Sequence, residues 1–122
     1  MSIEGSPYAW FRRSIEAGRG LDAWAAAHEL ESLSLADALA LCLVLLDEDA
    51  ARYDRAAVRW VGRLGSDARG LDLAGLSLVT DALVALPGPD PGPAIAALTL
   101  VLERRGERDT RELLEGWERR RR

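Results

Sequence analysis

The feature that most constrains the fold is a four-residue motif that occurs twice, each time between two segments whose apolar residues have helical spacing. The copies are Arg19-Gly20-Leu21-Asp22 and Arg69-Gly70-Leu71-Asp72. In each copy, Arg can complement the negative end of the preceding helix, Gly can take the left-handed conformation after it, and Asp can cap the next helix. The motif therefore predicts that one short helix ends and another begins at both places.

Apolar residues recur at intervals of three and four along nearly the whole chain, and no alternating strand pattern persists. Pro7 suits a first helical turn, Ser34 and Asp109 are each followed three residues later by an acid, as in a capping box, and Gly106 suits a helix stop. The helices expected from these signals cover residues 7–18, 22–32, 35–46, 50–64, 72–86, 93–105 and 109–122.

The predicted fold class is all-α, with about seven short helices as stacked antiparallel hairpins. A weak repeat with a period of 38 residues pairs Leu33-Ser34-Leu35-Ala36 with Leu71-Asp72-Leu73-Ala74. A true duplication would favour a short α-solenoid-like stack, and a chance match would favour an orthogonal bundle. Both arrangements stay open at this point.

Length and composition indicate one soluble domain over residues 1–122, because 48% of the 122 residues are apolar and 30% are charged. Residues 87–93 alternate Pro with Gly or Asp and predict a stiff connector inside that domain. Residues 118–122 form a basic tail, whereas the chain as a whole carries a net charge of −4. A negative chain is a poor nonspecific ligand for nucleic acid.

Several features predict a cytoplasmic protein that does not enter a membrane. The single cysteine, Cys42, excludes an intramolecular disulfide. The first residues lack the basic and apolar regions of a secretory signal. The longest apolar run, residues 38–46, is about half as long as a membrane span.

Residues that could carry chemistry are few. His28 is the only histidine, and the apolar surroundings of Cys42 predict a buried, inert thiol. Asp47, Glu48 and Asp49 lack the glycine-containing loop of a calcium site, and Asp49 is better placed to cap the following helix. Phosphate-binding, nucleophile-elbow and zinc motifs do not occur. We therefore expect no catalytic residue, no metal and no cofactor, with a small helical enzyme as the third-ranked alternative.

An arginine stripe runs along the helix expected at 50–64. At about 100° per residue its members fall within a sector of about 80°, opposite the apolar positions Tyr53, Ala57, Trp60 and Leu64. Guanidinium groups match the geometry of carboxylates and phosphates. The stripe is a candidate partner-binding surface, and the alternative is a solvated face paired with nearby acids. Its members are Arg52, Arg55, Arg59 and Arg63.

Two further surfaces are candidates for binding. Tyr8, Trp10 and Phe11 form an aromatic cluster in the first helix that either contacts a partner, a second copy included, or folds back as a lid over the core. At the other end, Trp117 precedes the basic run Arg119, Arg120, Arg121 and Arg122, which could contact nucleic acid or simply complement a helix end.

The segment Ser34-Leu35-Ala36-Asp37-Ala38-Leu39, followed by residues 49–60, resembles small uncharacterised all-helical proteins of high-GC Gram-positive bacteria. The resemblance covers about residues 20–105 and implies no particular activity. From the residues themselves we expect a noncatalytic protein-interaction or adaptor module that binds a protein partner or a second copy of itself. A regulatory protein that contacts nucleic acid through the basic tail is the alternative.

Overall fold

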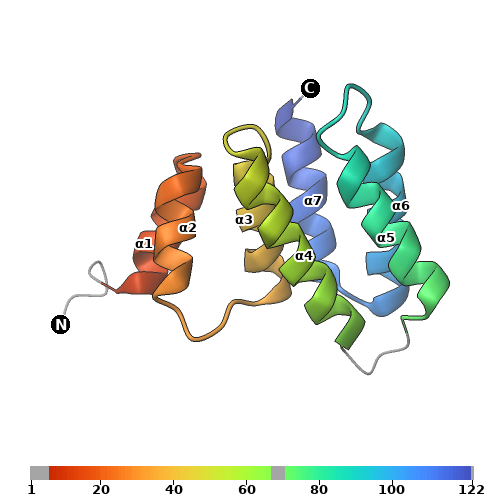
Figure 1. Ribbon diagram of the computed structural model, residues 1–122, viewed down its shortest axis with the longest axis horizontal. Coiled ribbons are helices and arrows are strands. Elements are labelled where there is room, and N and C mark those ends of the chain that lie inside the picture. Colours follow the sequence, from red (N-terminus) through yellow and green to blue (C-terminus); the bar gives the residue numbers. More distant parts are fainter. Residues whose placement is uncertain (1–5, 67–70, 122) are drawn as a thin grey trace. The chain divides into compact units, whose positions relative to one another are not determined.

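The computed structural model describes residues 6–66 and 71–121, which form seven α-helices and no strand (Figure 1). The all-α fold class is therefore confirmed. The chain divides into two compact units, and the division falls after Ala56, inside the fourth helix. The helices are α1 (Pro7–Glu16), α2 (Gly20–His28), α3 (Leu35–Leu46), α4 (Ala50–Ser66), α5 (Leu73–Ala85), α6 (Gly92–Arg105) and α7 (Arg108–Arg121).

In the first unit, α1 packs against α2 and α3, and α2 packs against α3. The Ser34 hydroxyl accepts a 3.0 Å hydrogen bond from the Asp37 N–H, which caps α3 as predicted. The helix that follows has almost no polar side chains and is buried over most of its surface. The fully buried side chains of this unit are Phe11, Ala23, Ala26, Leu39, Cys42 and Leu45.

In the second unit, α5 packs against α6, and α6 packs against α7. The Asp72 carboxylate accepts a 2.8 Å hydrogen bond from the Gly75 N–H, so the predicted cap of α5 is confirmed. The proline-rich connector lies between α5 and α6 as expected, although α6 takes in Gly92 and Pro93. The largest fully buried side chains of this unit are Trp60, Leu64, Leu86, Leu98, Leu102 and Leu114.

The first copy of the repeated motif, residues 19–22, does not form the predicted helix end and cap. Gly18, not Gly20, takes the left-handed conformation, with φ of 70°, and the N–H of Arg19 closes the end of α1 on the Ser14 carbonyl. Gly20 is already the first residue of α2, so Asp22 lies inside the first turn and caps nothing. In the second copy, Arg69 and Gly70 lie outside the described residues.

The start of α7 also differs from the prediction. Gly106 is left-handed, with φ of 73°, and the Glu107 N–H bonds back to the Leu102 carbonyl, so α6 ends as expected. The next helix begins at once, at Arg108, because Glu107 already accepts the N–H of Arg111 through its carbonyl. Asp109 therefore lies in the first turn, and its predicted role as the cap is wrong.

Candidate functional site

The first member of the arginine stripe is engaged at the start of α4. The Arg52 N–H donates to one Asp49 carboxylate oxygen at 3.0 Å, and its guanidinium donates to the other at 2.5 Å. Both bonds favour the charged carboxylate, the backbone bond most, and they lower the pKa of Asp49. The predicted cap by Asp49 is confirmed. The Arg52 guanidinium is used to bind the capping carboxylate.

The remaining stripe residues, Arg55, Arg59 and Arg63, are exposed on the side of α4 opposite the buried Tyr53 and Trp60. Within residues 6–66 and 71–121, no carboxylate forms an ion pair with Arg55 or Arg63. Val58 follows Arg55 by one helical turn and is 65% exposed. This face of α4 therefore combines outward guanidinium groups with an apolar side chain.

The aromatic cluster of α1 separates into three different environments. Phe11 is fully buried, whereas Trp10 is 37% exposed. The Tyr8 hydroxyl donates a 3.0 Å hydrogen bond to Asp37, and the Arg12 guanidinium donates a 3.1 Å bond to the other carboxylate oxygen of Asp37. The bond to Asp37 raises the pKa of Tyr8. Phe11 thus belongs to the core, Tyr8 is held by its hydrogen bond to Asp37, and the Trp10 indole is exposed to solvent.

The C-terminal candidate surface is only partly exposed. Arg119, Arg120 and Arg121 continue α7 and face solvent, while Arg122 lies outside the described residues. Trp117 is only 9% exposed, and the Arg121 guanidinium lies 4.6 Å from its ring centroid. Its indole packs in the second unit under a cation–π contact and does not present a face on which a base could stack.

The titratable residues considered for chemistry occupy structural positions. Cys42 is fully buried, and burial raises the pKa of its thiol to about 12, as the apolar run predicted. His28 is exposed, and its Nδ1 donates to the Trp24 carbonyl at 2.8 Å. Glu48 accepts a 2.6 Å hydrogen bond from the Gly20 N–H. No group of three His, Cys, Asp or Glu side chains in the described part of the chain is arranged to hold a metal ion.

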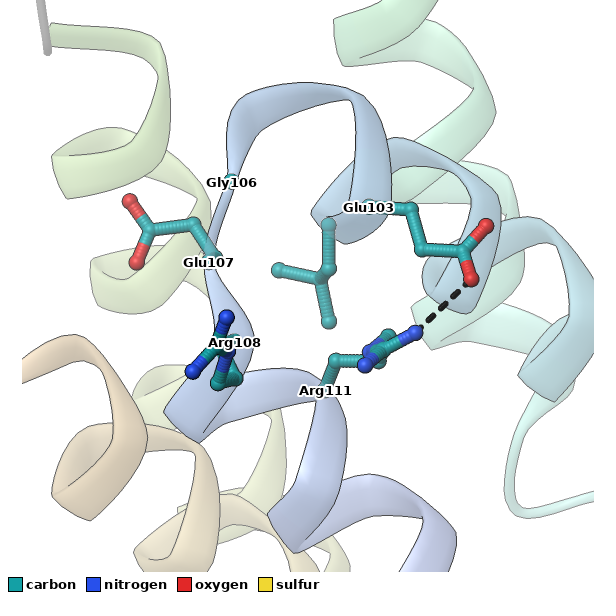
Figure 2. A pocket seen from close by; sticks show the side chains of 6 residues that line it. Glu103, Gly106, Glu107, Arg108 and Arg111 are labelled. Atoms are coloured by element: carbon teal, nitrogen blue, oxygen red, sulfur yellow. Dashed lines mark hydrogen bonds and ion pairs between the residues drawn. The ribbon is translucent and has the colours of Figure 1, made fainter.

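A pocket of about 220 Å³ lies at the turn between α6 and α7 (Figure 2). The Arg111 guanidinium donates to Glu103 across its rim at 2.8 Å, and Arg108 and Glu107 extend from the turn itself. Arg111 also lies 3.9 Å from Glu115. The charged residues described in its lining are two glutamates, Glu103 and Glu107, and two arginines, Arg108 and Arg111. Their charges balance, and Arg111 already binds Glu103.

A second pocket, of about 340 Å³, lies along α5 and α6, and we call it the α5–α6 groove. It was not predicted, because its residues come together only through the packing of two helices that the proline connector separates. Its apolar wall consists of Leu71, Ala74, Leu78, Leu100 and Val101. Asp72, Arg104 and Arg105 also line it.

No helix in residues 6–66 or 71–121 has both the length and the apolar character needed to cross a membrane. No protein-family model, curated protein or solved structure matches the chain. The resemblance to helical proteins of high-GC Gram-positive bacteria stays a prediction.

Proposed function

We propose that this protein is a noncatalytic interaction module whose α4 arginine stripe binds an acidic surface of a protein partner. The observation that carries the proposal is the exposed row of Arg55, Arg59 and Arg63 on one face of a regular helix. Arg55 and Arg63 have no carboxylate partner among the described residues, so their charge is available to an incoming ligand.

The chemistry of the stripe selects the class of partner. Guanidinium groups form two parallel hydrogen bonds with one carboxylate, and their planar faces are more weakly hydrated than an ammonium. Val58 adds apolar area on the same side of the helix. An acidic protein surface with at least one apolar side chain complements both properties.

The proposal is tested by charge reversal on the full-length chain. The wild type and the double variant Arg55→Glu/Arg59→Glu are used to capture partners from the native cytoplasm, and a captured protein is then purified and titrated by calorimetry. We expect the double variant to bind that partner at least about tenfold more weakly, a loss of about 1.4 kcal/mol. The matched control is Arg13→Glu/Arg19→Glu, which makes the same change in charge at two exposed positions.

Two results would overturn the proposal. In the first, both double variants retain every captured partner. In the second, the partners disappear after nuclease treatment and after Arg119→Glu/Arg120→Glu, which would assign the interaction to nucleic acid and the end of α7.

A further inference from the structure

α2 presents an acidic face to solvent. Asp22, Ala25 and Glu29 are exposed, and at about 100° per residue they fall within a sector of about 60°. Glu29 keeps right-handed helical backbone angles at the C-cap, so the helical spacing extends to it. Neither carboxylate forms an ion pair with another residue that the structure describes. We call Asp22, Ala25 and Glu29 the acidic α2 face.

The charge around this face is negative. Between residues 19 and 31 the chain carries three acids, Asp22, Glu29 and Glu31, and one basic side chain, Arg19. The first unit as a whole, residues 1–56, contains ten acids and five arginines. The acidic α2 face therefore repels anionic partners and complements a helix that presents arginines.

The α4 arginine stripe has the dimensions of such a helix. Asp22 and Glu29 are seven residues apart, which is about 10 Å along a helix axis, and Arg55 and Arg63 are eight residues apart, or about 12 Å. Ala25 lies between the two acids, and Gly62 lies on the stripe side of α4. Such small residues let two helix axes approach closely.

Both surfaces also carry an exposed apolar side chain. Leu21 directly precedes the acidic α2 face and is 48% exposed, and Val58 follows Arg55 by one turn and is 65% exposed. The chain itself thus contains an acidic, partly apolar helix that matches the α4 arginine stripe in charge, length and apolar content.

We propose that the α4 arginine stripe of one copy binds the acidic α2 face of a second copy of this chain, with Arg55 and Arg59 on Asp22 and Glu29. The inference rests on the function proposed for α4 and names the partner. Every copy carries both surfaces, so a two-fold pair makes the same contact twice. Because the contact joins opposite charges near the surface, added salt should weaken it.

A charge swap between two variants tests the contact. The stripe variant is Arg55→Glu/Arg59→Glu, and the face variant is Asp22→Arg/Glu29→Arg. Sedimentation equilibrium at low ionic strength should show that the wild type self-associates and that each variant alone does so at least about tenfold more weakly. An equimolar mixture of the two variants should associate again, because the new glutamates of one chain face the new arginines of the other and the two unchanged surfaces face each other.

The matched control for the face variant is Asp81→Arg/Glu112→Arg, which makes the same change in charge at exposed positions of α5 and α7. It should associate like the wild type. Circular dichroism shows which variants remain folded. If Asp22→Arg disturbs the first turn of α2, the single variant Glu29→Arg keeps the test decisive, because a positive charge at a helix C-terminus favours the fold.

Four outcomes would overturn the inference: a wild type that is monomeric at every concentration, association that neither swap variant weakens, equal losses from the face variant and its control, or a mixture of the swap variants that stays monomeric. The function proposed for α4 fails separately. If the wild type is monomeric but Arg55→Glu/Arg59→Glu still loses a captured partner, the stripe binds another protein and only the choice of a second copy is wrong.

Discussion

The backbone N–H of Gly20 donates a 2.6 Å hydrogen bond to the carboxylate of Glu48, which is 28 residues further along the chain. α2 therefore begins with a cap supplied from outside the helix, since Arg19, at the N-cap position, supplies no side-chain bond. A Cβ at Gly20 would collide with that carboxylate. A side chain at position 20 would therefore displace the Glu48 carboxylate from this cap, whereas the backbone at Gly20 is not left-handed.

Replacement of Glu48 by Ala should lower the free energy of unfolding by about 1 kcal/mol, the usual size of a lost N-terminal cap. Glu48→Gln keeps an oxygen acceptor and should lose less. Urea denaturation followed by circular dichroism measures both changes, with Glu31→Ala as a control of equal charge at an exposed site. Equal losses for Glu48→Ala and Glu31→Ala would contradict the assigned cap.

Gly106 should resist substitution because its φ of 73° disfavours any side chain. Gly106→Ala is expected to destabilise the protein by about 1 kcal/mol. Gly62 lies inside α4, where a Cβ would meet no atom within 4 Å, so Gly62→Ala should instead stabilise it by about 0.5–1 kcal/mol. Thermal melting should therefore show a lower Tm for Gly106→Ala and a higher Tm for Gly62→Ala than for the wild type.

The Cys42 thiol should be inert in the folded protein, since burial raises its pKa to about 12. A disulfide reagent at pH 8 is expected to modify Cys42 only in denaturant. Unfolded cysteine loses its proton near pH 8.5, while the folded thiol keeps its proton, so the thiol's contribution to stability falls as pH rises from about 8.5 to 12. Rapid modification of the native protein at pH 8 would refute this assignment.

Ultraviolet titration should reveal a tyrosine that depends on Asp37. The pKa of Tyr8 is raised mainly by its bond to Asp37, and the pKa of Tyr53 is raised mainly by burial. Asp37→Ala is expected to return Tyr8 toward its ordinary pKa near 10 and to leave Tyr53 unchanged. The wild type should gain stability from the Tyr8 contact below pH 10 and lose it as the pH rises further. An unchanged titration curve in Asp37→Ala would argue against the hydrogen bond.

Local signals in the sequence predicted most helix boundaries. Ser34, Asp49 and Asp72 cap as their positions indicate, since each accepts a bond from the N–H three residues later. Gly20 and Asp22 misled the prediction because Gly18 already ends α1 and the cap of α2 comes from a distant carboxylate. No local pattern around residues 18–22 predicts a cap from Glu48, which is 28 residues away.

The candidate surfaces were predictable to the extent that one helix contains them. The angular spacing of the α4 arginines follows from the helical repeat alone. The burial of Trp117 and the juxtaposition of Leu78 with Leu100 depend on how α5, α6 and α7 pack, and the sequence pattern does not specify that register. Asp37 was recognised as an acid near a cap, yet its partners Tyr8 and Arg12 lie 29 and 25 residues away.

The connector between α5 and α6 has a consequence for how this helix pair folds. Four prolines in residues 87–93 restrict the backbone angles of this turn, in the unfolded chain as well as in the folded one. The turn therefore loses less conformational entropy when α5 packs against α6 than a flexible connector of the same length would lose. Part of the stability of this helix pair thus comes from the restricted unfolded chain and not from any contact in the folded one.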